Sequence, residues 1–90
     1  MESYRFIVSG RVQGVGFRAA TRRKALILGL RGWVRNRDDG AVEGVVVGVT
    51  AESLREFKLW LSNGPPASHV LGVEWVAAAL ESHDTFVIRR

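Results

Sequence analysis

Apolar and polar residues alternate along several short stretches of this 90-residue chain, whereas two other stretches repeat apolar residues at helical spacing. Alternation predicts strands, because successive side chains of a strand point to opposite faces, and apolar residues three or four positions apart predict helices. The predicted strands cover residues 4–10, 32–37, 41–49, 69–80 and 85–89. The predicted helices cover residues 17–28 and 50–61.

Each predicted helix has one apolar stripe and recognisable ends. Gly29 suits the C-cap of the first helix, Thr50 suits the N-cap of the second, and the glycine and prolines at 64–66 end the second. The stripe of the first helix consists of Phe17, Ala20, Thr21, Ala25 and Leu28. The stripe of the second consists of Leu54, Phe57, Trp60 and Leu61.

The elements follow one another in the order βαββαβ, with a short strand at the end and turns at 38–40 and 82–84. Because a strand–helix–strand crossover is right-handed, this order folds into an α+β sandwich with two helices on one face of a mainly antiparallel sheet. The first two strands run parallel, so their C-terminal ends lie at the same edge of the sheet. Trp60 is expected in the core, and Trp33 and Trp75 on the uncovered sheet face.

The segment Gly10–Arg18, with the sequence GRVQGVGFR, joins the first strand to the first helix. Its glycines permit a positive φ, so several backbone N–H groups of residues 13–18, which we call the cradle, can point into one concavity at the helix N-terminus. Such a concavity favours an oxyanion such as phosphate, and the planar guanidinium of Arg18 can bind the same anion. The alternative is a plain strand-to-helix turn whose glycines serve geometry and whose arginine serves solubility.

A dinucleotide-binding fingerprint also matches this segment, since Gly14, Gly16 and Ala19 fit G-x-G-x-x-G/A and an acidic pair follows about twenty residues later. The context argues against that interpretation. A dinucleotide-binding fold needs several parallel strands, whereas Asp39 and Gly40 predict a hairpin that makes the third strand antiparallel to the second.

Asn36 lies near the C-terminal end of the second strand, at the sheet edge that also carries the cradle. It has the same parity as Val34, so both are expected to face the helices, while Trp33 and Arg35 face the other way. The topology therefore brings Asn36 close to the cradle although eighteen positions separate it from Arg18. The alternative is a strand-end residue that is hydrogen-bonded within its own turn.

The composition is that of a soluble globular domain, with 47% hydrophobic and 24% charged residues. No apolar run approaches the roughly 20 residues of a membrane span, and the N-terminus lacks the apolar core of a signal peptide, so a cytoplasmic location is expected. The absence of cysteine excludes disulfides and thiolate chemistry, while His69 and His83 lack metal-ligand spacing and are expected to be solvated. A net charge of +4 and a pI near 10.7 favour anionic ligands, nucleic acid and small phosphates alike.

The segment Gly10–Arg18, the stretch LGLRGWVRN at 28–36 and the Asp-Gly pair at 39–40 closely resemble the two signature segments of the acylphosphatase family. The resemblance continues through Gly64, Pro65 and the closing FVI at 86–88, so it covers essentially the whole chain. It implies a single domain over residues 1–90 with a ferredoxin-like fold, strand order 4-1-3-2 and a short fifth strand beside strand two. It also implies hydrolysis of the carboxyl–phosphate bond of acyl phosphates.

The resemblance also implies roles for individual residues. Arg18 and Asn36 would be catalytic, with Arg18 fixing the phosphoryl group and Asn36 orienting the attacking water. We expect no cofactor and no metal, a monomer, and a small-molecule acyl phosphate as the partner rather than nucleic acid or a membrane. The residues implied in binding the phosphate are Gln13, Gly14, Val15, Gly16, Phe17 and Arg18.

Two other functions are alternatives. RNA-recognition domains share the βαββαβ order, but they stack bases on aromatic residues of strands one and three. The third strand here reads AVEGVVVG and has no aromatic residue, which counts strongly against a nucleic-acid-binding module. A non-catalytic phosphate-binding module could retain both Arg18 and Asn36, so the sequence leaves that alternative open.

The predicted last strand runs parallel to the first two, so it leads back to the sheet edge that carries the cradle. The carboxylate of Arg90 would then lie within reach of Arg18 and could orient its guanidinium before a substrate binds. The alternative is a frayed and solvated end of the chain.

Overall fold

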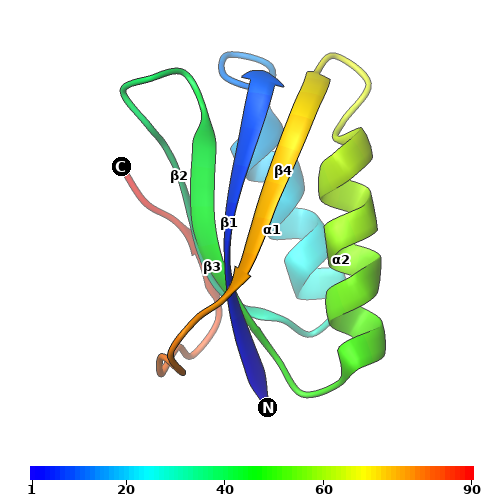
Figure 1. Cartoon of the computed structure of the whole chain (residues 1–90), viewed down its shortest axis with the longest axis vertical. Coiled ribbons are helices and arrows are strands. Elements are labelled where there is room, and N and C mark those ends of the chain that lie inside the picture. The colour runs from blue at the N-terminus through cyan, green and yellow to red at the C-terminus, as the bar shows by residue number, and fades with distance from the viewer.

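The computed structural model describes residues 1–90 and contains two helices and five strands (Figure 1). All the predicted elements are present, with a longer first strand and a shorter fourth strand than predicted. The helices are α1 (Phe17–Ile27) and α2 (Ala51–Asn63). The strands are β1 (Glu2–Arg11), β2 (Arg31–Asn36), β3 (Val42–Gly48), β4 (His69–Ala77) and β5 (Phe86–Ile88).

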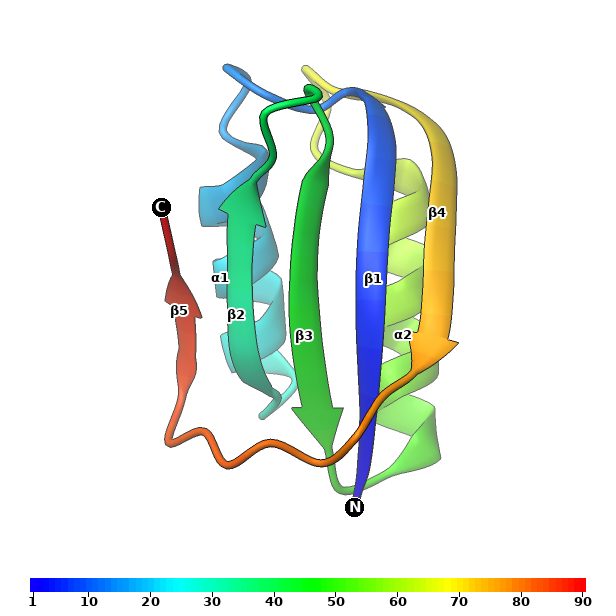
Figure 2. The same cartoon turned by 60° about the vertical axis from the view of Figure 1, so that its left-hand side comes forward.

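The five strands form one sheet in the order β4-β1-β3-β2-β5. The β3 strand pairs antiparallel with both β1 and β2, β4 pairs antiparallel with β1, and β5 pairs parallel with β2. Both helices cover the same face of this sheet (Figure 2). The predicted α+β sandwich is therefore confirmed, together with its strand order and the place of the short fifth strand beside β2.

The segment 78–85, between β4 and β5, runs from one edge of the sheet to the other across the face that the helices leave free (Figures 1 and 2). The backbone N–H of Ala78 donates a hydrogen bond to Ser3 O at 2.9 Å. Ser3 on β1 and Val47 on β3 lie opposite each other on this face, and both are buried. The far face of the sheet is thus covered at one end.

His83 lies in this covering segment. Its side chain is largely buried, and its Nε2 atom lies 2.7 Å from Glu81 Oε1. The prediction that His83 is solvated is therefore wrong.

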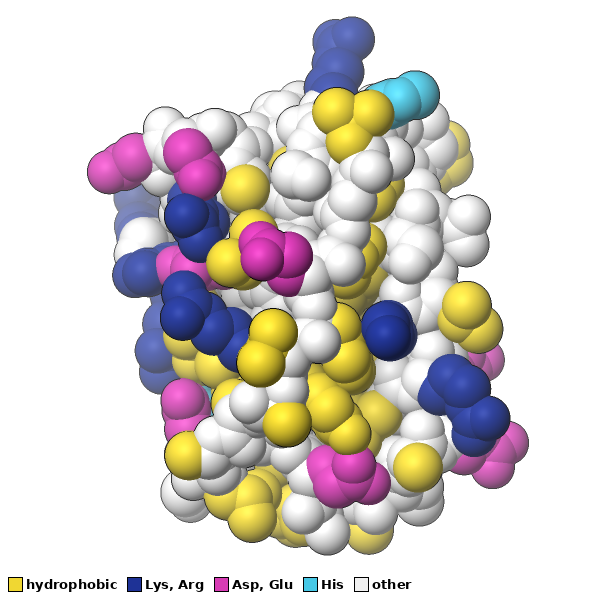
Figure 3. All heavy atoms as spheres, viewed as in Figure 1, with side chains coloured by type: hydrophobic (Ala, Val, Ile, Leu, Met, Phe, Trp, Pro, Cys, Tyr) yellow, Lys and Arg dark blue, Asp and Glu magenta, His cyan; other side chains and the backbone are white.

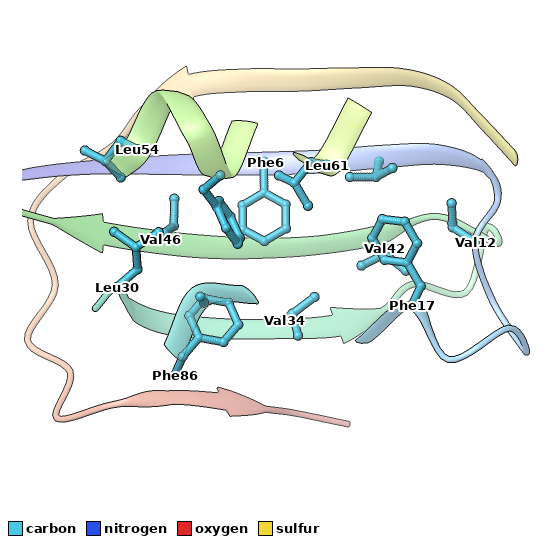
Figure 4. Close-up of a cluster of buried hydrophobic side chains, with 13 residues drawn as sticks. Phe6, Val12, Phe17, Leu30, Val34, Val42, Val46, Leu54, Leu61 and Phe86 are labelled. Carbon is cyan, nitrogen blue, oxygen red and sulfur yellow. The ribbon is translucent and has the colours of Figure 1, made fainter. Parts of the chain in front are cut away.

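The core lies between the sheet and the two helices, and thirteen buried side chains form one cluster there (Figure 4). Phe17 from the start of α1 packs beside Val12 and Val42 at the end of the core that adjoins the cradle (Figure 4). Trp60 was expected in the core, but it is only partly buried and packs at the core's margin, with its ring 5.8 Å from that of Phe17. The core therefore fixes the first residue of α1, and with it the direction in which that helix N-terminus points.

Trp75 lies on the helix-covered face, so its predicted place on the uncovered face is wrong. It is opposite Phe6, and its ring lies 4.9 Å from that of Tyr4 and 6.4 Å from that of Phe57 on α2. Phe6 is buried in the core, and the regular pairing of β1 with β4 from Tyr4 to Ser9 places Trp75 on the same face. The register shifts only beyond this stretch, next to Ser9. The face of Trp75 is therefore set by pairing with a distant strand.

A buried carboxylate occupies the far face of the sheet. Glu43 on β3 accepts hydrogen bonds from Arg5 Nη2 at 3.0 Å and from Arg35 Nε at 2.6 Å, and Arg37 Nη1 lies 3.5 Å from it. Burial alone would raise the pKa of Glu43, but the hydrogen bonds and charges of Arg35 and Arg5 outweigh this effect and hold the pKa below its ordinary value. The ionised form of Glu43 therefore stabilises the folded state.

Replacing Glu43 by glutamine is expected to lower the free energy of unfolding by about 1–2 kcal/mol, because charge-assisted hydrogen bonds are lost from a buried site. For a domain of this size that corresponds to a fall in melting temperature of roughly 4–8 °C per kcal/mol. In the wild type this contribution is fully present above the ordinary glutamate pKa of 4.5, and it is lost as the pH falls through the lower pKa of the folded state.

Thermal melts of both proteins at neutral pH and through the acid range test this prediction. Glu74→Gln, at an exposed position on β4, is the matched control. Equal melting temperatures for wild type and Glu43→Gln at neutral pH would show that Glu43 does not stabilise the fold.

Candidate functional site

The cradle joins β1 to α1 and presents a run of unpaired backbone donors. No group of the protein accepts a hydrogen bond from the backbone N–H groups of residues 13–19, and no side chain caps α1. Gly14 and Gly16 have φ of 74° and 76°, and a Cβ at either position would meet nothing within 4 Å. These two glycines are thus required for their left-handed backbone rather than for lack of space.

The unpaired donors open into a cavity of about 740 Å³ at the N-terminus of α1. No aspartate or glutamate side chain lines this cavity, and α1 has no acidic residue in its first turn. The free N–H groups and the positive end of the helix dipole therefore make the cavity favourable for an anion. Its lining consists of Val12, Gly14, Gly16, Phe17, Arg18, Ala19, Asn36, Ile88 and Arg90.

Arg18 is the second residue of α1, and its side chain is partly buried in the cavity wall. Its guanidinium has neither a hydrogen-bond acceptor nor an ion-pair partner within the protein, in contrast to Arg5, Arg35 and Arg37 on the far face of the sheet. The planar donors of Arg18 are therefore free to bind a ligand with two parallel hydrogen bonds.

Asn36 ends β2 and lines the same cavity as Arg18. Its Oδ1 atom is buried and has no hydrogen-bond partner in the protein. A buried acceptor without a partner costs free energy, so a polar ligand or a water molecule is expected to bind there. The alternative, in which the Asn36 side chain is hydrogen-bonded within its own turn, does not describe its Oδ1 atom.

The fold brings these groups together because β1 and β2 run in the same direction on either side of β3. Val34 is fully buried on the helix side of β2, and Asn36, two residues further, lines the cavity on that side. Trp33 lies on the opposite side, where its ring contacts the guanidinium of Arg89 at 4.7 Å and that of Arg35 at 5.5 Å. The structure therefore confirms the prediction that Val34 and Asn36 lie on the helix side of β2 and Trp33 on the other side.

Four of the six residues expected to bind phosphate line the cavity, and two do not. Gly14, Gly16, Phe17 and Arg18 lie in the cavity wall. Gln13 and Val15 do not line it, although their backbone N–H groups are unpaired; the Gln13 side chain turns instead toward the β2–β3 hairpin. Sequence reasoning missed Val12, Ala19 and Ile88, small or apolar residues whose types indicate no chemistry.

Comparisons with known proteins identify the family of this chain. The family model named Acylphosphatase matches residues 4–88. The chain belongs to the acylphosphatase family. Its fold matches the crystal structure of acylphosphatase from Bacillus subtilis with a TM-score of 0.95 and 43% sequence identity, over 100% of both chains.

Two bacterial acylphosphatases are also close in sequence. The acylphosphatase of Xanthomonas euvesicatoria pv. vesicatoria is 47% identical over 87 residues, which are 97% of this chain and 98% of that protein. The acylphosphatase of Cupriavidus pinatubonensis is 49% identical over 74 residues, which are 82% of this chain and 81% of that protein. The chain is therefore a hydrolase of acyl phosphates with a ferredoxin-like fold, and the nucleic-acid-binding and non-catalytic alternatives are set aside. Neither of its helices is long and apolar enough to cross a membrane.

The end of β5 forms one wall of the acylphosphatase cavity. Arg89 N donates a hydrogen bond to Val34 O at 2.8 Å, which extends the pairing of β5 with β2, and Arg90 lines the cavity. No ion pair joins the carboxylate of Arg90 to Arg18. The expectation of a C-terminus near the site is confirmed, whereas the expected contact with Arg18 is not formed.

A second hollow, of about 570 Å³, lies against the same end of β2 on the far face of the sheet. Its lining is entirely polar, and it shares Asn36 and Arg90 with the first cavity. Lys and Arg side chains gather on the side of the molecule that carries β2 and the C-terminus (Figure 3). Arginine and carboxylate side chains alternate in this second hollow, so the attraction of anionic ligands rests on the net charge of +4 of the whole chain.

Deleting Arg89 and Arg90 is expected to raise the substrate KM severalfold, because one wall of the cavity and two positive charges are removed. It should also lower the melting temperature, since the hydrogen bond to Val34 O and the stacking of Arg89 on Trp33 are lost. Steady-state kinetics and thermal melts of the shortened chain test this. Wild-type KM and melting temperature would show that these residues do not shape the site.

Proposed function

We propose that the cradle and Arg18 bind the phosphoryl group of an acyl phosphate, and that Asn36 positions the water that attacks it. The observation that carries this proposal is a set of unpaired donors beside one cavity. The backbone N–H groups of residues 13–19 and the Arg18 guanidinium have no acceptor in the protein, and residues 14 and 16–19 line the cavity together with Asn36, whose Oδ1 is unpartnered. The backbone donors belong to the main chain at the start of α1, so they need little reorganisation as charge develops in the transition state.

In the proposed reaction the water oxygen forms a bond to phosphorus as the bond from phosphorus to the acyl oxygen breaks. The electron pair of that bond leaves with the carboxylate. The pKa of a carboxylic acid is about 4 to 5, so the leaving group needs no general acid. The charge spread over the three other phosphoryl oxygens is stabilised by the cradle N–H groups and by Arg18.

The attacking water loses a proton during the reaction, and we propose that a phosphoryl oxygen of the substrate accepts it. No histidine, aspartate, glutamate or lysine lines the cavity, so its walls contain no side chain suited to act as a general base. The Oδ1 atom of Asn36 accepts a hydrogen bond from the water and holds it opposite the leaving group. The products are a carboxylate and inorganic phosphate.

Turnover of benzoyl phosphate, followed by its absorbance, is the direct experiment. Inorganic phosphate is expected to inhibit competitively, since it is both a product and a ligand of the cradle. Failure of phosphate to compete with the substrate would contradict capture of the phosphoryl group by the cradle.

The activity is expected to survive exhaustive treatment with EDTA unchanged. In the proposed site N–H donors and a guanidinium neutralise the phosphoryl charge, so no metal ion is needed for that purpose. Assays before and after dialysis against the chelator, with and without added Mg²⁺ or Zn²⁺, check this. Loss of activity that either metal restores would refute the metal-free mechanism.

A further inference from the structure

The Gln13 side chain connects the cradle to the hairpin that follows Asn36. Its Nε2 atom donates one hydrogen bond to Arg37 O at 2.8 Å and another to Ala41 O at 2.9 Å. Both N–H bonds of this amide are thus used on two carbonyls, one on each side of the β2–β3 turn. The backbone of Gln13 belongs to the cradle, and Arg37 is the residue directly after Asn36.

The hairpin held by Gln13 is itself tightly hydrogen-bonded. Arg37 N donates to Ala41 O at 2.8 Å, and Gly40 N donates to Arg37 O at 3.3 Å. The Asp39 carboxylate accepts a hydrogen bond from Ala41 N at 3.1 Å and pairs with the Arg37 guanidinium at 3.0 Å. Because these bonds make the turn stiff, fixing its two carbonyls also fixes the end of β2, where Asn36 lies.

We propose that Gln13 is a positioning residue, whose side chain sets the distance between the phosphate held by the cradle and the water held by Asn36. This inference rests on the proposed function, since it concerns the relative placement of those two groups. Core contacts fix Phe17 and α1 on one side of the cavity, while the pairing of β2 with β3 and β5 fixes Asn36 on the other. Residues 12–16 between them belong to no helix or strand, and the Gln13 amide is the side-chain hydrogen bond that ties this loop to the hairpin.

The size of the effect follows from the geometry that in-line attack requires. Displacement of a reacting group by about 1 Å can reduce the rate by 10²-fold. Gln13→Met keeps the length of the side chain but has no N–H donor, so the loop and the hairpin can move apart. We expect kcat of this variant to fall by roughly 10- to 100-fold, with a smaller change in the inhibition constant of inorganic phosphate.

A double-mutant cycle with Asn36→Ala distinguishes positioning of Asn36 from a general loss of structure. Once Asn36 has been removed, the distance that Gln13 sets has no catalytic consequence, so Gln13→Met should reduce kcat by no more than about 2-fold in that background. Thr50→Ala removes the N-cap of α2 and is the matched control, because it lowers stability without contact with the site. Its kcat should equal that of the wild type.

Gln13→Glu adds a readout that depends on pH. The carboxylate of this variant has no donor for the two carbonyl oxygens, whereas its protonated form has one. The ratio of its kcat to that of the wild type should therefore rise as the pH falls through the pKa of the new carboxyl group.

Four results would overturn the proposal: wild-type kcat in Gln13→Met, an equal fold-loss in both backgrounds of the cycle, a comparable loss in Thr50→Ala, or a pH-independent deficit in Gln13→Glu. If the wild type itself does not turn over benzoyl phosphate, the proposed function fails and this inference fails with it. An active wild type combined with any of the four results refutes the role of Gln13 alone.

Discussion

Arg18→Ala is expected to abolish phosphate binding and to reduce turnover by on the order of 10³-fold or more, the range over which an arginine stabilises the transition state of phosphoryl transfer. The guanidinium of Arg18 has no partner in the protein, so its removal breaks no internal hydrogen bond or ion pair and the fold should remain intact. Calorimetry with inorganic phosphate measures the binding, and benzoyl phosphate kinetics measure the turnover.

Two further variants show whether charge alone explains the loss. Arg18→Lys should recover little activity, because an ammonium group is a point charge and cannot reproduce two parallel hydrogen bonds to phosphate oxygens. Arg22→Ala removes a charge one turn further along α1, at an exposed position, and should behave like the wild type. Wild-type phosphate affinity in Arg18→Ala would remove Arg18 from the site.

Asn36→Ala is expected to reduce turnover by about 10²-fold or more, as for the loss of one preorganised polar group. Inhibition by inorganic phosphate should change little, since the cradle and Arg18 still bind the anion. This separation of kcat from phosphate affinity is the measurement that distinguishes a water-positioning residue from a phosphate ligand.

The control for Asn36 is Asn63→Ala, which removes an exposed asparagine at the end of α2. Its kinetic constants should match those of the wild type. If Asn36→Ala lost phosphate affinity as severely as turnover, Asn36 would have to be reassigned as part of the phosphate-binding set.

The backbone of the site could be predicted because its determinants are local. Glycines at 14 and 16 require positive φ values that other residues rarely adopt, and the helix that starts at Phe17 follows at once. The crossover rule then places the ends of β1 and β2 at one edge of the sheet, and parity along β2 directs Asn36 toward the cavity. Each of these steps uses neighbouring residues or a general rule of topology.

The features that escaped prediction depend on partners distant in sequence. The Gln13 amide donates to the backbone carbonyls of two other residues. Because every residue has a backbone carbonyl, the side-chain types along the sequence do not indicate which residues Gln13 contacts. Glu43 is buried although it is a glutamate, because Arg5 comes to it from a strand that lies nearly forty positions earlier. The face occupied by Trp75 follows from its pairing with Phe6 on β1, a strand far earlier in the chain.

The place of β3 between β1 and β2 bears on the order of events during folding. This strand contributes no residue to the cavity lining, yet it follows both Arg18 and Asn36 in the chain. It must insert between β1, which leads into the cradle, and β2, which ends at Asn36, before the two residues can face the same ligand. Pairing of strands distant in sequence is slow compared with helix formation, because the loops between them must close first. In refolding experiments catalytic competence should therefore return with the completed sheet, and later than the helical signal in circular dichroism.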